Sequence, residues 1–247
     1  MGQTASEHMR GGEEFPATHW SVILRAAQGG SAIADASLAK LCEGYWYPIY
    51  AFLRHRGHKP EEAEDLTQGF FDRLVHQEVL AGLTEEGGRF RSFLLTALKR
   101  FLVNEWRHEH AQKRGGGRVI ISFDDAVESR YQQELVDHAT PEALFEQQWA
   151  LTVLDRVLTR LREEYASAGK SEIFARLEGC LPGAGEGLSY AEAGTALQMS
   201  EAALRMSAHR LRRRYGELLR AEITQTVSNP DEVDEEIRHL IAAACGG

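Results

Sequence analysis

The sequence SYAEAGTALQMSEAALRMSAHRLRRRYGELLR, residues 189–220, decides the expected fold of the C-terminal half of the chain. Ser189 is a favourable N-cap, and Glu192 completes a capping box three residues later, so a short helix is predicted through Leu197. A brief turn follows, and Ser200 is the predicted cap of a second, longer helix. The segment is therefore predicted to be a helix-turn-helix.

The second helix of this segment has one apolar face and one basic face. Apolar side chains recur at helical spacing and predict a buried stripe made of Leu204, Ala208, Leu211, Tyr215 and Leu218. Guanidinium groups on the opposite face suit contact with phosphates and base edges in a major groove. A merely solvated arginine-rich helix is the alternative, and the capped helix before it favours DNA binding. The candidate DNA-contacting residues are Ala202, Arg205, Met206, His209, Arg210 and Arg213.

Charge is unevenly distributed along a chain whose net charge is −9. Residues 89–114 hold seven Lys or Arg against two Glu, and residues 201–220 hold six Arg against two Glu. Acidic residues gather in 61–65, 124–142 and 231–236. This pattern predicts local binding to nucleic acid and a basic partner for another surface.

Several functional classes are disfavoured by the composition. The three cysteines, Cys42, Cys180 and Cys245, are far apart, which argues against a disulfide framework and fits a reducing cytoplasm. No apolar run has transmembrane length and no signal-peptide core is present, so we expect no membrane partner. The sequence contains no catalytic constellation and no metal-ligand spacing. We therefore expect a protein that is not an enzyme and needs no cofactor or metal.

The chain is predicted to be all-α, with two helical domains joined by an acidic linker. In the first domain, Pro60 opens a helix with acidic residues in its first turn. A long helix that starts at Phe90 alternates aromatic and basic residues. The expected parts are a disordered N-terminus (1–14), a first domain (15–114), the linker (115–140), a helix-turn-helix domain (141–228) and an acidic C-terminal helical extension (229–247).

The order of these parts resembles a bacterial RNA polymerase sigma factor of the extracytoplasmic-function (ECF) type. EEAEDLTQGFF, residues 61–71, is similar to the polymerase-binding region 2.2 of that family. FRSFLLTALKRFLVNEWR, residues 90–107, is similar to regions 2.3 and 2.4, which melt and read the minus-ten element. The helix-turn-helix resembles region 4.2, which reads the minus-thirty-five element. The resemblance implies RNA polymerase core and promoter DNA as partners.

The resemblance and the residue chemistry together assign two further sets of site residues in the first domain. Cations hold phosphates and aromatic faces accept unstacked bases, which selects Arg91, Lys99, Arg100, Trp106 and Arg107 for DNA. The polymerase-binding set is Glu61, Glu62, Glu64, Asp65 and Gln68. Stabilisation of the helix dipole is the alternative reading of these carboxylates.

Regulation is predicted at one position. AQKRGGG, residues 111–117, is similar to a subgroup of the family from bacteria rich in Ser/Thr protein kinases, which implies a kinase as a partner. An anti-sigma protein is the other regulatory partner that the resemblance suggests. Thr67 lies within the acidic helix, where a phosphate would add about −1.5 to −2 charge. An ordinary helical threonine is the alternative.

Two questions stay open at the level of sequence. A stand-alone helix-turn-helix regulator with an N-terminal sensing or dimerisation domain is the alternative to a sigma factor. The C-terminal helix has an apolar stripe of Val233, Ile237, Leu240 and Ile241, with Asp231, Glu232, Asp234, Glu235 and Glu236 expected to face outward. It is too short to be stable alone and must dock. It either masks Arg210–Arg214 or packs structurally on the back of the second domain.

Overall fold

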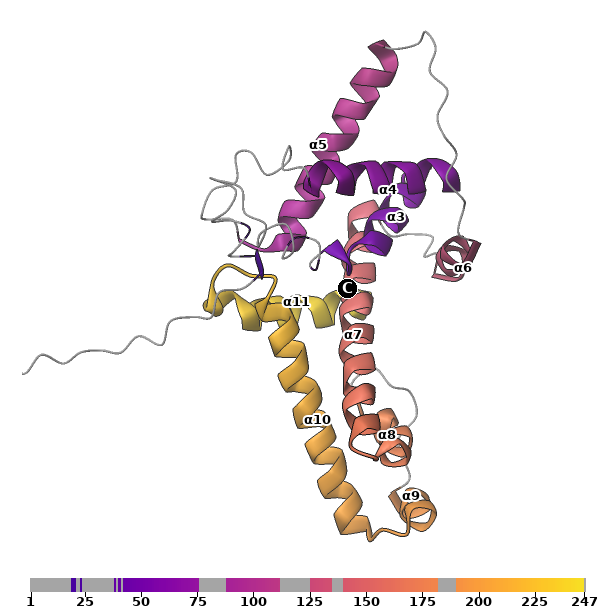
Figure 1. Cartoon of the computed structure of the whole chain (residues 1–247), viewed down its shortest axis with the longest axis vertical. Helices are drawn as coiled ribbons and strands as arrows, with labels where there is room; N and C mark the ends of the chain where they lie inside the picture. Colours follow the sequence, from indigo (N-terminus) through magenta and orange to yellow (C-terminus); the bar gives the residue numbers. More distant parts are fainter. Residues whose placement is uncertain are drawn as a thin grey trace, which may run out of the picture.

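The computed structural model describes residues 19–20, 23, 38, 40, 42–75, 88–111, 125–134, 140–181 and 190–246. The all-α prediction is confirmed: within these ranges there is no strand, and the one β-bridge pairs Arg89 with Val227. The predicted N-terminal segment 1–14 and most of residues 15–41 lie outside the described residues. Figure 1 shows an elongated molecule with α5 at one end of its long axis and α9 at the other.

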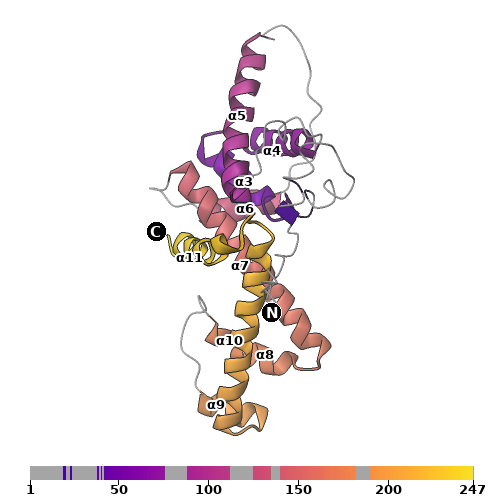
Figure 2. The same ribbon diagram turned by 90° about the vertical axis from the view of Figure 1, so that its left-hand side faces the viewer.

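The helices fall into an upper and a lower group (Figures 1 and 2). The upper group contains α3 (Trp46–His55), α4 (Pro60–Val75), α5 (Phe90–Ala111) and α6 (Asp125–Glu134). The lower group contains α7 (Pro141–Ser167), α8 (Ser171–Leu177), α9 (Tyr190–Leu197) and α10 (Glu201–Thr224). Two short 3₁₀ turns are also present: Glu178–Cys180 follows α8, and Pro230–Glu232 precedes the last helix, α11 (Val233–Ala244).

Helix starts follow the expected capping chemistry. Pro60 is the first residue of α4, where its missing N–H costs nothing. Thr140 caps α7, because its side-chain oxygen accepts a hydrogen bond from the Ala143 amide at 3.1 Å. Ser200 caps α10 in the same way, with 3.3 Å between its Oγ and the Ala203 nitrogen, as predicted.

The central helix α7 joins the two groups. Its first half packs along α3 and its second half along α10, while α11 crosses it. Phe145 and Trp149 are fully buried, and the Phe145 ring lies 6.4 Å from that of Tyr45. The residues predicted to open the second domain thus share a core with the first domain, because a 27-residue helix of about 40 Å is long enough to serve both.

The predicted linker, 115–140, contains a docked helix. Glu128 of α6 accepts hydrogen bonds from the Tyr50 hydroxyl at 2.7 Å and from Arg54 Nε at 2.8 Å. Arg54 also lies over the Tyr131 ring, 5.0 Å from its centroid. The sequence of this segment shows only that it is acidic. Its docking depends on Tyr50 and Arg54 of α3, which precede Glu128 by 78 and 74 residues.

The C-terminal helix α11 packs against α7 and the end of α10, and it lies far from the start of α10. This position favours the structural role over the masking of Arg210–Arg214. Val233 and Leu240 are buried as predicted, whereas Ile241 is 52% exposed. The expectation that Glu236 faces outward is wrong, since its side chain is completely buried against Arg89 and Arg91.

The turn between α9 and α10 requires close packing at one glycine. Gln198 adopts the left-handed conformation (φ 54°), and the Met199 amide donates to the Gly194 carbonyl at 3.0 Å. A Cβ atom at Gly194 would lie 3.0 Å from the Met199 carbonyl oxygen and 3.4 Å from a Leu204 methyl carbon. The absence of a side chain at this position therefore lets α9 pack closely against α10.

The docking of α6 is expected to depend on pH. The hydrogen-bonded Arg54 holds the pKa of Glu128 at about 2, below its ordinary value of 4.5. A carboxyl group whose pKa is lower in the folded than in the unfolded protein stabilises the fold at pH values above its unfolded-state pKa. This stabilisation is lost as the pH falls through the folded-state pKa. We expect the protection of α6 amides, measured relative to the intrinsic exchange rate at each pH, to fall between pH 4.5 and 2.

Amides of α7 provide the internal control for global acid unfolding in that experiment. In Glu128→Gln the α6 amides should be less protected near neutral pH, and their protection relative to the intrinsic rate should change little down to the acid range. Protection of α6 that persists to pH 2 in the native protein would contradict this assignment.

Packing at the helix-turn-helix predicts opposite effects for two glycines. Gly194→Val should destabilise the fold by about 1–3 kcal/mol, since its branched methyls meet the Met199 backbone. Gly216→Ala in α10 meets no atom within 4 Å and should stabilise the helix by about 1 kcal/mol. Denaturant unfolding measures both changes, and equal stability of the two variants would argue against the close approach of α9.

Candidate nucleic-acid interface

The first part of α10 has the two faces that its sequence predicts. Leu204, Ala208 and Leu211 are fully buried, and Tyr215 and Leu218 are nearly so. The opposite face is open to solvent, with Met206 at 54% exposure. The predicted DNA-contacting residues are all exposed: Ala202, Arg205, Met206, His209, Arg210 and Arg213.

Neighbouring helices bind the other arginines of α10. Arg212 Nε donates to the Cys180 carbonyl at 2.9 Å, in the 3₁₀ turn that follows α8. Arg214 makes two 2.8 Å hydrogen bonds to the Glu164 carboxylate of α7. Arg220 pairs with Asp234 of α11. These three side chains connect α10 to groups elsewhere in the chain, whereas the ion pairs of Arg205 and Arg213 lie within α10.

Two arginines of the outward row form ion pairs within their own helix. Arg205 lies 2.5 Å from Glu201, and Arg213 lies 2.9 Å from Glu217, with both arginine side chains more than two-thirds exposed. Exposed pairs of this kind contribute only about 0–1 kcal/mol. Phosphate or a base edge can therefore replace the glutamate at little energetic cost.

A second basic surface covers the outer face of α5. Arg100 and Arg107 are exposed, and Lys99 is exposed while it contacts Glu142 at 2.8 Å. Trp106 is 60% exposed, which fits its predicted availability to an unstacked base. Together with Thr96, Val103 and Asn104, these cations line a shallow depression of about 490 Å³.

Arg91 does not belong to this surface, and its predicted contact with DNA is wrong. Its side chain is only 6% exposed and pairs with Glu236 and Glu146, each at 2.6 Å. Spacing explains the position, because Arg91 precedes the buried Leu94 and Leu98 by three and seven residues and shares their face. A DNA phosphate cannot reach this guanidinium while the cluster is intact.

The predicted polymerase-binding residues lie on α4, next to the basic face of α5. Glu61 and Gln68 are exposed, whereas Glu62, Glu64 and Asp65 are half-buried. Glu62 contacts His58 Nδ1 at 2.9 Å. A cavity of about 400 Å³ separates the two surfaces, and both Glu62 and Trp106 line it. Of the predicted polymerase-binding residues, Glu62 is the one that lines this cavity together with Lys99 and Trp106 of α5.

Thr67 is completely buried on the inner face of α4, and its predicted phosphorylation is wrong. The hydroxyl donates to the Ala63 carbonyl one turn earlier, at 2.6 Å. Leu66 and Phe70 are buried beside it in the sequence. A kinase would have to unwind α4 to reach this oxygen, so the structure supports the ordinary helical threonine.

Val103 is a surface residue that the sequence-based assignment missed. It is 48% exposed, one helical turn before Trp106, and it lines both depressions on α5. Its i,i+3 spacing to Trp106 was the signal that could have placed both on one exposed face.

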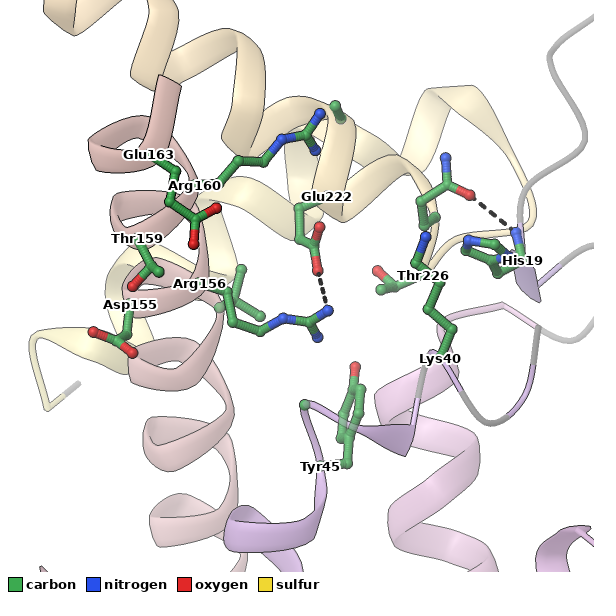
Figure 3. Close-up of a pocket in the computed structure, with 14 residues that line it drawn as sticks. His19, Lys40, Tyr45, Asp155, Arg156, Thr159, Arg160, Glu163, Glu222 and Thr226 are labelled. Carbon is green, nitrogen blue, oxygen red and sulfur yellow. Dashed lines mark hydrogen bonds and ion pairs between the residues drawn. The ribbon is translucent and has the colours of Figure 1, made fainter. Parts of the chain in front are cut away.

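A larger cavity, of about 740 Å³, lies between α7, α10 and residues near the N-terminus (Figure 3). Gly44 permits the close approach of Arg156, because a Cβ there would lie 2.7 Å from the guanidinium. Arg156 contacts Glu222 at 3.4 Å, and the Tyr45 ring points its hydroxyl toward this space. Acidic Asp155, Glu163 and Glu222 offset the basic side chains, so this cavity lacks the positive charge that nucleic acid requires.

The described residues also bear on membrane spanning and metal binding. No described helix is long and apolar enough to cross a membrane. The same part of the chain has no group of three His, Cys, Asp or Glu side chains placed to hold a metal ion.

Comparison with known proteins identifies the family. Neither a curated protein nor a solved structure matches the chain. The model of a family described as "ECF sigma factor" matches residues 21–221, which include α3 to α9 and most of α10. With most of its length matched and with two exposed basic helix faces, the chain belongs to the ECF sigma factor family.

Proposed function

We propose that this sigma factor binds RNA polymerase core through α4 and directs it to promoters through α10 and α5. Family membership supports a role in transcription initiation. The observation that carries the finer proposal is the separation of the arginines of α10 into two groups. Arg205, Arg210 and Arg213 are exposed, and the ion pairs of Arg205 and Arg213 are with glutamates of α10 itself, while Arg212, Arg214 and Arg220 contact groups of the chain outside α10.

The first turns of α10 have the geometry of a recognition helix. α9 packs against α10 across the Gln198 turn, so the N-terminal end of α10 projects from the molecule (Figure 1). In helix-turn-helix proteins this end enters the major groove and contacts base edges. Arg205 is therefore proposed to read bases, and Arg213, two turns later, to bind phosphate.

The outer face of α5 suits a separated strand better than a duplex groove. Arg100 and Arg107 provide charge for the backbone, and Trp106 offers a flat apolar surface for a base. α4 supports this face from behind, since the Phe70 and Phe101 rings are 5.6 Å apart. Promoter opening is proposed to use this surface.

Family membership favours this function over a stand-alone helix-turn-helix regulator. The proposal involves no chemical reaction, and it places the protein in the cytoplasm, where polymerase and DNA meet. A regulatory anti-sigma protein or kinase stays a prediction of the family resemblance, and Thr67 is no longer its site.

Replacing Arg205 and Arg213 one at a time should distinguish an arginine that reads bases from one that binds phosphate. Arg205→Ala should cost about 1–3 kcal/mol at the preferred promoter and relax sequence preference. Arg213→Ala should weaken binding to all sequences and lower the salt slope by about 1. The measurement is binding of the polymerase-bound protein to promoter variants over a range of salt concentration.

Arg220→Ala is the matched control, since it removes the same charge from the same helix at a site paired with Asp234. It should leave sequence preference unchanged. An equal loss for Arg205→Ala on every promoter variant would remove Arg205 from the base-reading set.

Charge reversal on α4 should weaken polymerase binding. Glu61→Lys together with Glu64→Lys should raise the Kd for core polymerase by about tenfold or more, because charge complementarity guides association. Glu163→Lys, an exposed reversal on α7, is the control. Circular dichroism checks that α4 stays helical, and unchanged core affinity in the double variant would count against this surface.

A further inference from the structure

The cavity of about 740 Å³ shown in Figure 3 has walls from parts of the chain that are far apart in the sequence. One wall is the middle of α7 (153–163), and another is the end of α10 with the residues that follow it (221–226). The third wall comes from residues near the N-terminus, which include Lys40 and Tyr45. The volume lies within the range of about 300–1,000 Å³ that is typical of small-molecule sites.

Hydrogen bonds fix the N-terminal wall to the end of α10. The His19 amide donates to the side-chain oxygen of Gln225 at 3.1 Å, and the Trp20 amide donates to the Gln225 carbonyl, also at 3.1 Å. The Trp20 indole donates to the Gly88 carbonyl at 2.8 Å. The cavity is therefore formed in the free chain, which lowers the ordering cost of binding a ligand there.

Opposite charges line the cavity in equal number. Burial and the nearby Lys40 lower the pKa of His19, so its imidazole is neutral near pH 7. A cavity with balanced charge disfavours a polyphosphate, whereas a ligand that carries both charges finds a partner for each of them. The basic side chains of the lining are Lys40, Arg156 and Arg160, and the acidic ones are Asp155, Glu163 and Glu222.

A long ion pair between α7 and α10 faces this space. Arg156 Nη2 lies 3.4 Å from Glu222 Oε1, and both side chains are partly exposed. A well-formed pair of this kind is closer, at about 2.7–2.9 Å, so each group retains hydrogen-bonding capacity for a ligand. The carboxylate and the ammonium group of an α-amino acid are carried by adjacent carbon atoms, so one molecule can contact Arg156 and Glu222 together.

Gly44 and Tyr45 shape the space beside this pair. A Cβ atom at Gly44 would lie 2.7 Å from Arg156 Nη1, so the guanidinium occupies the place of a side chain. The Tyr45 hydroxyl points toward the cavity, and it is buried with no hydrogen-bond partner among the described residues. An unpaired buried hydroxyl is unfavourable, so a ligand oxygen that reaches it gains affinity.

We propose that this cavity binds a free α-amino acid, with its carboxylate on Arg156 and its ammonium group on Glu222. Thr159, Gln225 and Thr226 line the remaining volume, which favours a polar side chain. A bound molecule contacts α7, α10 and the N-terminal residues at once, so it stabilises their arrangement by mass action. None of the lining residues belongs to the proposed DNA-binding or polymerase-binding sets, so the inference does not depend on the proposed function.

The first test measures thermal unfolding of the full chain with named probes. The common L-amino acids are added one at a time at millimolar concentration, and at least one with a polar side chain should raise the Tm by several degrees. Calorimetric titration then gives the Kd for that amino acid. No rise with any amino acid would overturn the proposal. An equal rise with sodium acetate or methylammonium chloride, which carry only one of the two charges, would overturn it as well.

Arg156→Gln and Arg162→Gln are the matched variants for the carboxylate contact. Arg162 belongs to the same helix and lies 3.4 Å from Glu178, outside the cavity. Arg156→Gln should raise the Kd for the amino acid by about tenfold or more, whereas Arg162→Gln should change it by less than about twofold. Equal effects of the two variants would contradict the site. Gly44→Ala, whose Cβ displaces the Arg156 guanidinium, replaces Arg156→Gln if that variant does not fold.

Glu222→Gln and Glu178→Gln test the ammonium contact in the same way. The native protein should bind the amino acid about tenfold or more tightly than the same molecule without its amino group. Glu222→Gln should abolish this preference, and Glu178→Gln should keep it. A preference that survives in Glu222→Gln would overturn the proposed orientation of the ligand. These measurements contain neither polymerase nor DNA, so their outcome is independent of the test of promoter recognition.

Discussion

The buried carboxylate of Glu236 is the interaction on which the arrangement of the two helical groups depends. Glu236 forms ion pairs with both Arg91 and Arg89, and Arg91 forms a further ion pair with Glu146 of α7. Removing one partner of such a cluster typically costs about 3–5 kcal/mol, because the remaining charge stays buried. The C-terminal extension is thus part of the core rather than an appendage, and the ends of α5 and α10 meet beneath it.

The carboxylate and carbonyl partners of the arginines also distinguish structural arginines from those available to DNA. Arg212 binds the 3₁₀ turn after α8 and Arg214 binds α7, so both orient the recognition helix. Arg205 and Arg213 form exposed ion pairs with glutamates of their own helix, and such pairs exchange readily for phosphate. A chain with net charge −9 can therefore present a basic face to DNA, because some of its acidic residues pair with structural arginines such as Arg91 and Arg214.

Local patterns predicted much of the candidate site. The cap at Ser200, the start of α4 at Pro60, the buried stripe of α10 and the exposure of Trp106 follow from spacing and capping within one helix. Arg91 was assigned wrongly because charged residues were assumed to be exposed, although its spacing to Leu94 places it on the apolar face. The predicted phosphorylation of Thr67 overlooked a similar signal, because Thr67 lies on the same buried face of α4 as Ala63 and Phe70.

The sequence by itself determined the all-α fold, the helix-turn-helix and the two basic segments, because each depends on residues within a few turns of one another. Only the tertiary structure decided that α7 serves both helical groups, that α6 docks on Arg54, and that Glu236 is buried. A carboxylate enters a core only where an opposite charge meets it, and that partner, Arg91, lies 145 residues away. No local pattern contains that information.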